Sequence, residues 1–316
     1  MTTSAGTGGG PRVVDAAALE AVLPMSAAID ALERGFREQD PGAAPLRSHL
    51  ETPSGTLLTM PASGEGGVGV KLVSLTPGNP DRGMPFLHAV YVLFDPETQA
   101  PEAVIDGAAM TALRTAAVSG LATRHLARPD ARRLVIFGAG VQARAHLDSM
   151  RAVRPIEEVV IVSRSADRAR ELVASAIAAG VEARVGTPDD VAAADIVCTC
   201  TTSPAPLFDG GRLSAGAHVN AVGAYTPDTR EVDTETVRRA RVVVETRDVA
   251  LAEAGDILIP IAEGAVTPDH VLADLSEVVR DERTARGSLE DVTFFESVGM
   301  AFEDLIVARA VVEGSR

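Results

Sequence analysis

The stretch LVIFGAGVQA, residues 134–143, decides the fold of this chain. Its first four residues are apolar, as in a buried strand, and they lead directly into a turn with the spacing G-x-G-x-x-A. Gly138 permits the tight turn, Gly140 lets the backbone come close to a pyrophosphate, and Ala143 lets the following helix pack against the strand. That helix would also present free N–H groups to a phosphate. The stretch therefore predicts the strand, turn and helix that open a Rossmann dinucleotide-binding unit.

After this stretch, strands alternate with helical patterns. Helical spacing covers residues of about 142–152 and 167–180. Further largely apolar runs lie at 159–162, 196–198, 219–222 and 242–244. Apolar strands joined by helices indicate a parallel sheet that is covered on both faces. We therefore predict an α/β fold, with a doubly wound Rossmann domain over residues 127–295.

The N-terminal part of the chain has a different pattern. A helical stretch over residues 15–40 precedes three strand-like segments, and an alanine-rich helix over 107–127 follows them, beginning near Asp106. The strand-like segments lie at 56–60, 68–74 and 87–94. This order predicts an α+β domain for substrate binding and dimerisation over residues 1–126. Residues 1–10 have the composition of a disordered lead-in.

The C-terminal part predicts one more helix, over about 295–312. This helix comes too late, and is too long, to belong to another strand–helix unit of the sheet. We expect the segment 296–316 to pack back on the N-terminal domain.

The composition argues against several classes of protein. The chain has 316 residues, 46 % of them hydrophobic, a net charge of −15 and a pI of about 4.8. We expect no nucleic-acid partner, because phosphate binding needs clustered lysine and arginine. No apolar run has the length of a membrane span and no signal-peptide core is present, so we expect a cytoplasmic protein with no membrane partner. Cys198 and Cys200 are too few for a metal site and badly placed for a disulfide.

The end of the second Rossmann strand predicts which dinucleotide is bound. An NAD enzyme usually has an acidic residue there, about 20 residues after the glycine turn, to bind the ribose. This chain has Ser163-Arg164-Ser165, with Arg168 one turn later. A guanidinium and two hydroxyls could bind a 2′-phosphate, and no carboxylate would repel it. The segment therefore favours NADP(H) over NAD(H).

Three cations stand among small or apolar neighbours in the N-terminal part. Of the 29 lysine and arginine residues, Lys71 is the only lysine, and it lies in the strand-like run GVKLV. A buried lysine can give up its proton, whereas arginine holds its proton at any relevant pH. Arg47 and Arg114 carry the guanidinium that binds a carboxylate through two hydrogen bonds.

Together these segments resemble the ornithine cyclodeaminase/μ-crystallin family, from about Arg47 to Asp304. The resemblance is carried by the strand lysine and by five motifs: LRTAA (113–117), GAGVQ (138–142), SRS (163–165), NAVG (220–223) and SVGMA (297–301). It implies a homodimer formed through the non-Rossmann domain, with the substrate between the domains beside the nicotinamide.

The resemblance also implies the roles of single residues. Arg47, Lys71 and Arg114 would face the substrate carboxylate, with Val298 beside them. The remaining implied cofactor contacts are Thr115, Val141, Gln142, Thr201, Val222, Gly223, Ser297 and Gly299.

One position departs from the family pattern. In the cyclodeaminases an Asp lies two residues after the first glycine of the segment that here reads GAYTPD, residues 223–228, and this chain has Tyr225 there. The change weakens the case for oxidative deamination, whereas reduction of an imine needs only the cofactor, a carboxylate clamp and a proton source.

We therefore predict an NADPH-dependent reductase of small, cyclic imino carboxylates, with Lys71 as the catalytic residue that delivers the proton. A dehydrogenase of open-chain or N-substituted amino acids is close to this prediction. The alternatives are an NAD-dependent ornithine cyclodeaminase and, from another class, a crystallin-like protein that only binds NADPH or another ligand.

Overall fold

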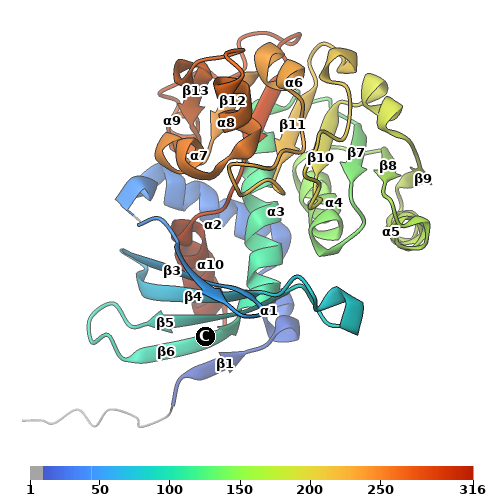
Figure 1. Ribbon diagram of the computed structural model, residues 1–316. Helices are drawn as coiled ribbons and strands as arrows, with labels where there is room; N and C mark the ends of the chain where they lie inside the picture. The colour runs from blue at the N-terminus through green and yellow to red at the C-terminus, as the bar shows by residue number, and fades with distance from the viewer. Residues whose placement is uncertain (1–9, 44, 316) are drawn as a thin grey trace, which may run out of the picture.

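The computed structural model describes residues 10–43 and 45–315 and arranges them around two sheets (Figure 1). An eight-stranded sheet lies at the top of Figure 1, a six-stranded sheet lies at the bottom, and α2, α3 and α10 lie between them. The predicted lead-in lies outside the described residues, except for Gly10. No helix among the described residues is both long and apolar enough to span a membrane.

The larger sheet is parallel throughout, with the strand order β13-β12-β14-β11-β10-β7-β8-β9. Its strands are β7 (Arg133–Phe137), β8 (Glu158–Val162), β9 (Glu182–Val185), β10 (Ile196–Thr199), β11 (His218–Ala221), β12 (Arg241–Val244), β13 (Val271–Asp274) and β14 (Thr293–Glu296). The strand order reverses beside β7, and in such sheets the carboxyl ends of the strands open there into a ligand-binding crevice. The predicted doubly wound Rossmann fold is confirmed.

Both faces of this sheet are covered, because successive side chains of β7 enter different clusters. Leu134 and Ile136 pack with α4 (Val141–Val153) and α5 (Ala166–Ala178). Val135 and Phe137 belong instead to the larger cluster, in which Phe137 stacks on Phe208. The other helices of this half are α6 (Thr234–Arg239), α7 (Arg247–Glu253), α8 (Gly255–Ala262) and α9 (Leu275–Val279).

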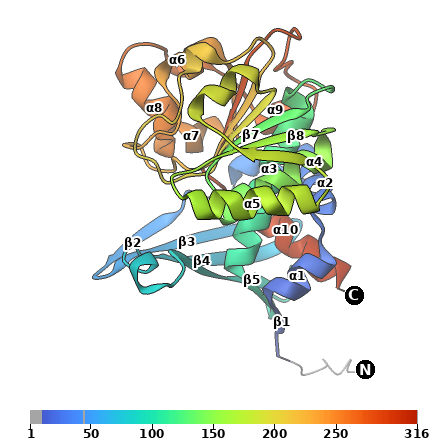
Figure 2. The ribbon, with the colours of Figure 1, turned by 90° about the vertical axis from the view of Figure 1, so that its right-hand side faces the viewer.

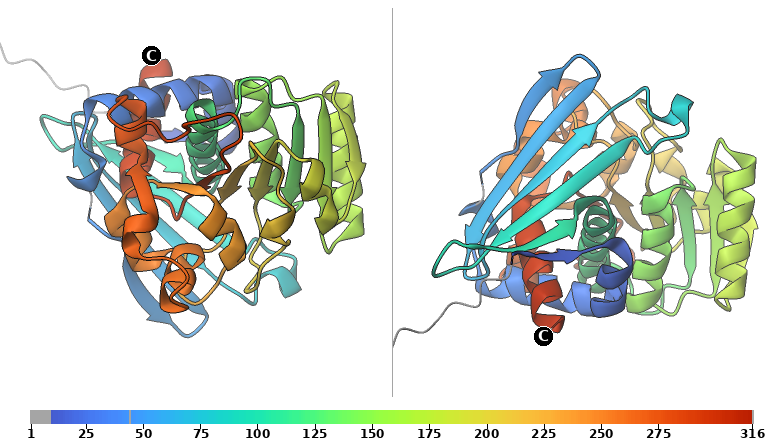
Figure 3. Two further views of the ribbon diagram at one scale, coloured as in Figure 1. Left: turned by 90° about the horizontal axis from the view of Figure 1, so that it is seen from above. Right: turned by 90° about the horizontal axis from the view of Figure 1, so that it is seen from below.

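The smaller sheet has the order β1-β6-β5-β4-β3-β2, and every pair except β1 with β6 is antiparallel. Its strands are β1 (Arg12–Val14), β2 (Ser48–Thr52), β3 (Gly55–Gly64), β4 (Gly67–Leu75), β5 (Leu87–Phe94) and β6 (Pro101–Asp106). Alternate residues of β4 are buried, and Lys71 is one of them. On the other face Val68, Val70 and Leu72 are half-buried, and Figure 3 (right) looks onto this face.

One helix, α3 (Gly107–Leu126), belongs to the core of both halves. It packs against β5 of the small sheet and against β11 and β14 of the large one. Asp106 begins it as predicted, accepting hydrogen bonds from the backbone N–H groups of Ala108 and Ala109. Figure 2 shows α3 passing between the two sheets, with α10 (Ala301–Gly314) ending beside α1 (Ala16–Val22).

Two predicted helices have different bounds in the structure. The stretch 15–40 is split into α1 and α2 (Met25–Glu38), because Pro24 interrupts it. The helix predicted from residue 295 begins only at Ala301, so that part of the prediction was wrong. Residues 293–296 form β14 instead, in which Phe294 and Phe295 are fully buried between β11 and β12. Besides β14, the strands β1, β2, β6, β9 and β13 were not predicted.

Substitution of the two glycines in the turn after β7 should lower the free energy of unfolding by different amounts. Gly138 has a φ of 109°, and a Cβ there would lie 2.5 Å from the carbonyl oxygen of Cys200. Gly140 has an ordinary φ of −93°, and apart from its chain neighbours no described residue lies within 4 Å of the position of its Cβ. We expect Gly138→Ala to lower the free energy of unfolding by about 1–3 kcal/mol, and Gly140→Ala to change it by less than about 0.5 kcal/mol. Denaturant unfolding without nucleotide measures both, and equal losses would contradict this account.

Candidate active site

The turn after β7 has the shape that a pyrophosphate needs. Gly138 donates its N–H to the carbonyl of Val162 at 2.8 Å, which closes the turn. Gly140 is the N-cap of α4, and no side chain in the described part of the chain caps the free N–H groups of this helix. Val141, the first helical residue, is 70 % exposed. An uncapped helix N-terminus beside open space can receive phosphate oxygens, so these residues fit the predicted dinucleotide.

The segment after β8 carries exposed cations. Ser163 accepts a hydrogen bond from the backbone of Ser165, and Ser165 caps α5 by accepting one from the N–H of Arg168. The side chains of Arg164 and Arg168 are exposed and form no ion pair or hydrogen bond with any described residue. Arg170, farther along α5, is paired with a carboxylate. The two unpaired guanidinium groups are therefore available to an anion at this edge.

A buried carboxyl group holds the ends of β10 and β11. Glu231 accepts hydrogen bonds from the backbone N–H and hydroxyl of Thr201 at 2.7 and 2.5 Å, and from the N–H of Gly223 at 2.8 Å. Burial raises the pKa of Glu231, while these hydrogen bonds oppose the rise. Val222 lies half-buried beside Gly223. Three of the predicted cofactor contacts thus lie together, at the carboxyl edge of the sheet beside β7.

Residues 297–300 carry the chain from the large sheet to the helix layer of the small one. The hydroxyl of Ser297 donates to Glu245 at 2.6 Å, and the N–H of Gly299 donates to the same carboxylate at 2.8 Å. Gly299 has a φ of 83°, and a Cβ there would lie 2.4 Å from Nη1 of Arg114. The guanidinium of Arg114 therefore lies directly against this crossing segment.

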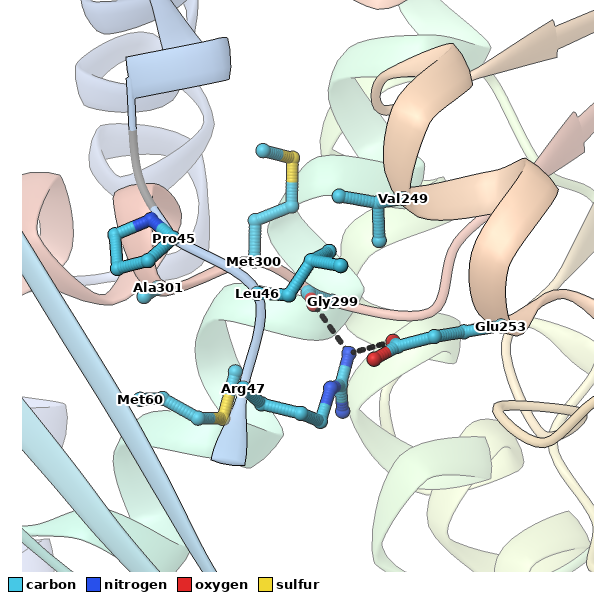
Figure 4. A pocket seen from close by; sticks show the side chains of 9 residues that line it. All are labelled: Pro45, Leu46, Arg47, Met60, Val249, Glu253, Gly299, Met300 and Ala301. Atoms are coloured by element: carbon cyan, nitrogen blue, oxygen red, sulfur yellow. Dashed lines mark hydrogen bonds and ion pairs between the residues drawn. The ribbon is translucent and has the colours of Figure 1, made fainter. Parts of the chain in front are cut away.

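Arg47 reaches the same segment from the loop before β2 (Figure 4). Its Nη2 donates to the carbonyls of Val298 and Gly299 at 2.7 and 2.6 Å, and lies 3.0 Å from Oε2 of Glu253 at the end of α7. The Arg47 side chain is 7 % exposed. Apolar side chains line much of the surrounding pocket: Leu46, Met60, Val249 and Met300.

Lys71 and Arg114 share one carboxylate at the start of α10. Lys71 Nζ lies 2.8 and 2.7 Å from the two oxygens of Asp304, and Arg114 Nε lies 3.1 Å from Oδ1 of the same residue. Nη1 of Arg114 donates to Glu303 at 2.7 Å. Lys71 is 1 % exposed and Arg114 is 5 % exposed. The structure thus brings both residues together with Arg47, around residues 298–304.

The electrostatics of this cluster favour a lysine that can release its proton. Burial and the neighbouring Arg114 lower the pKa of Lys71 to about 8, although Asp304 opposes the shift. Arg114 remains a cation, since Asp304 and Glu303 raise its pKa despite burial. A general acid is most effective when its pKa lies near the working pH.

Three further residues adjoin this cluster or the dinucleotide turn. Thr115 is buried on α3, beside Arg114. Gln142 points from α4 toward α3, with its Nε2 3.4 Å from the carbonyl of Thr111. Burial raises the pKa of Tyr225, and the charge of Arg47 opposes this, so the residue that replaces the cyclodeaminase Asp lies near the cluster.

The acidic partners of the cations were not predicted as site residues. Glu303 and Asp304 follow the SVGMA motif in an otherwise apolar helix start, AFEDLIVA, and two acids in such a run need buried partners. Glu245 directly follows the apolar strand β12. The sequence around Glu231 and Glu253 gives no similar indication that these acids have buried partners.

Comparison with known proteins agrees with this architecture. Ketimine reductase mu-crystallin of Mus musculus is 37 % identical over 261 residues, which cover 82 % of this chain and 80 % of that protein. The structure of Thermococcus litoralis Δ1-pyrroline-2-carboxylate reductase, in complex with NADH and L-proline, matches with a TM-score of 0.92 at 36 % identity, covering 96 % of this chain and 97 % of that one. An archaeal alanine dehydrogenase dimer with bound NAD matches with a TM-score of 0.91 at 32 % identity, covering 96 % of both chains.

The match to a protein family also extends over nearly the whole chain. Residues 11–316 fit the pattern of one family over all the elements described above, in agreement with the resemblance seen in the sequence. The chain belongs to the ornithine cyclodeaminase/mu-crystallin family.

Proposed function

We propose that this protein is an NADPH-dependent reductase of small imino carboxylates, with cyclic ketimine carboxylates as its first candidates. The observation that carries the proposal is the position of Lys71, which is buried with Arg114 and Arg47 where a Rossmann sheet meets a second sheet. Guanidinium groups suit the substrate carboxylate, and the ammonium suits an imine nitrogen that must gain a proton. The reductase and ketimine reductase relatives support this substrate class.

Each cation has its own role in the proposed reaction. Arg47 and Arg114 bind the substrate carboxylate and so orient its C=N bond. Every bond from Arg47 to a described residue runs through Nη2, which leaves Nε and Nη1 for a ligand. When bound, the reduced nicotinamide supplies the hydride for the imine carbon. Lys71 donates a proton to the nitrogen.

The nucleotide preference follows from the edge of β8. Arg164 and Arg168 are exposed without partners in the described part of the chain, and both lie where the adenosine ribose binds in Rossmann domains. Ser163 and Ser165 add hydroxyl groups, and the carboxylate of this segment, Asp167, is paired with Arg170. These four residues support a 2′-phosphate, and therefore NADP(H).

Activity assays separate this function from its alternatives. We expect NADPH oxidation with Δ1-pyrroline-2-carboxylate and no release of ammonia from ornithine in the presence of NAD. The reverse result would support a cyclodeaminase. Turnover of pyruvate with ammonia alone would support an open-chain amino acid dehydrogenase, and NADPH binding without any turnover would support a crystallin-like protein.

We also infer a homodimer that forms through the smaller sheet. Residues 1–126 with the C-terminal helix would make the substrate-binding and dimerisation unit, and residues 127–295 would hold the cofactor. The half-buried apolar face of β4 and the 61 % exposure of Leu50 on β2 support a surface that a second copy covers. Light scattering on the purified protein tests this inference, and a monomer would contradict it.

The first prediction concerns the nucleotide. NADPH should bind more tightly than NADH by about tenfold or more, because a charge-assisted hydrogen bond contributes roughly 1.5–3 kcal/mol. Arg164→Gln combined with Arg168→Gln should remove most of this preference, whereas Arg170→Gln, whose arginine is already paired, should keep it. Calorimetric titration measures each affinity. A wild-type protein that prefers NADH would refute the assignment.

The second prediction concerns the carboxylate clamp. Arg47→Gln should raise KM for the imino acid by about ten- to a hundredfold, since one charged hydrogen-bond partner is lost. NADPH affinity should change little. Arg37→Gln is the matched control, because among the described residues the side chain of that arginine on α2 makes only a surface ion pair of 3.6 Å with Glu33. Similar KM values for all three proteins would argue against the clamp.

The third prediction concerns proton delivery by Lys71. Lys71→Met and Lys71→Arg should both lower kcat by about 10²–10⁴-fold, because arginine keeps its proton at any working pH. In the wild type, kcat/KM should fall as the pH rises through about 8, where Lys71 loses its proton. NADPH binding to both variants serves as the test of folding. A Lys71→Arg enzyme with wild-type kcat would show that only the charge matters.

A further inference from the structure

One carboxylate contacts both of the most deeply buried cations. Asp304 lies in the first turn of α10, is fully buried, and reaches Lys71 on β4 and Arg114 on α3. Both of its oxygens lie within 2.8 Å of Lys71 Nζ, and Oδ1 also lies 3.1 Å from Arg114 Nε. Three elements that are distant in the sequence therefore meet at a single side chain.

The neighbouring acid cannot replace it as the counter-charge. Glu303 contacts Arg114 but makes no contact with Lys71 among the described residues. Burial and the nearby Glu245 raise the pKa of Glu303 well above its usual range, whereas Arg114 opposes the rise. Asp304 is thus the group that compensates the charge of Lys71.

We propose that Asp304 is a positioning residue of this site: it holds the Lys71 ammonium beside Arg114 and keeps it charged, ready to donate its proton. Without this carboxylate, two cations would face each other in a site that excludes water, and Lys71 would lower the cost by releasing its proton. The inference rests on the proposed reductase function, because it concerns the proton that Lys71 delivers.

All the charged groups that face Lys71 determine the direction of the effect. From α3, Arg114 disfavours the ammonium, and from the loop before β2 Arg47 does the same more weakly. From α10, Asp304 favours it through both charge and hydrogen bonding. Tyr91 on β5 lies directly across from Lys71 in the sheet, and its pKa is raised by burial and by Asp304, so it is a neutral hydroxyl. Removing Asp304 therefore lowers the pKa of Lys71.

The test compares pH profiles of imine reduction with Δ1-pyrroline-2-carboxylate and NADPH. Lys71 is active when protonated, so kcat/KM falls as the pH rises through the pKa of Lys71. An opposite charge in contact with a group shifts its pKa by about 1–3 units. Asp304→Asn should therefore move the fall in kcat/KM to lower pH by about 1–3 units. The loss of kcat/KM relative to the wild type should become smaller as the pH is lowered. If the substitution damaged only the packing, the loss of kcat/KM would be the same at every pH.

Tyr91→Phe is the matched control, because it removes a buried polar atom beside Asp304 and leaves every charge in place. Its pH profile should match the wild type. Any titration of the substrate itself affects the wild type and the variants equally, so it does not change the comparison. An active wild type with an unmoved profile in Asp304→Asn would overturn the inference alone, and a wild type without imine reductase activity would overturn the proposed function as well.

Asp304→Glu decides the question if Asp304→Asn does not fold. This variant keeps the charge but adds a methylene to a fully buried side chain, which displaces the carboxylate from its two partners. We expect a pH profile like that of the wild type, with kcat lowered by about tenfold or more because proton transfer depends on position. Wild-type kcat in Asp304→Glu would overturn the positioning role. NADPH affinity, measured in parallel, reports that the large sheet is intact.

Discussion

A buried charge without a partner costs several kcal/mol, and three cations are buried or nearly buried where the two sheets of this protein meet. Their partners all belong to the segment that leaves the large sheet after β14, or to α7 beside it. This segment begins in the large sheet and ends in the helix α10, which packs on the small one. The contacts that pair the buried cations therefore also fix the two sheets relative to each other.

Neutral side chains and arginines make the other polar contacts across the junction. His146 on α4 lies 3.0 Å from the hydroxyl of Ser119 on α3, and Asn220 on β11 donates to Thr123 on α3 at 2.9 Å. Burial lowers the pKa of His146 to about 4, so its ring is neutral at neutral pH. Arginines join the two halves as well: Arg154 donates to the carbonyls of Thr123, Arg124 and Ala127 at the end of α3, and Arg280 donates to that of Gln39 after α2. Among the described residues, the ion pairs whose two side chains are both at most 5 % exposed are those of Lys71 and Arg114 with Glu303 and Asp304.

The buried acids beneath the carboxyl edge of the large sheet have raised pKa values. Burial raises the pKa of Glu231, Asp256 and Glu296, and the mutual repulsion of their carboxylates adds to the rise for Asp256 and Glu296. The first cause in each case is the removal of the carboxyl group from water, which disfavours its charged form.

The sequence by itself determined the Rossmann unit, because the strand, glycine turn and helix of residues 134–153 depend on local steric rules. It also indicated the cations Arg47, Lys71 and Arg114 as candidates, since their neighbours are apolar. It did not determine β14: a short Thr-Phe-Phe-Glu segment beside a long helical pattern becomes a strand only because β11 and β12 leave a place between them. Only the tertiary structure assigned Asp304 to Lys71, since ion pairing across 233 residues depends on how distant elements pack and has no local signature.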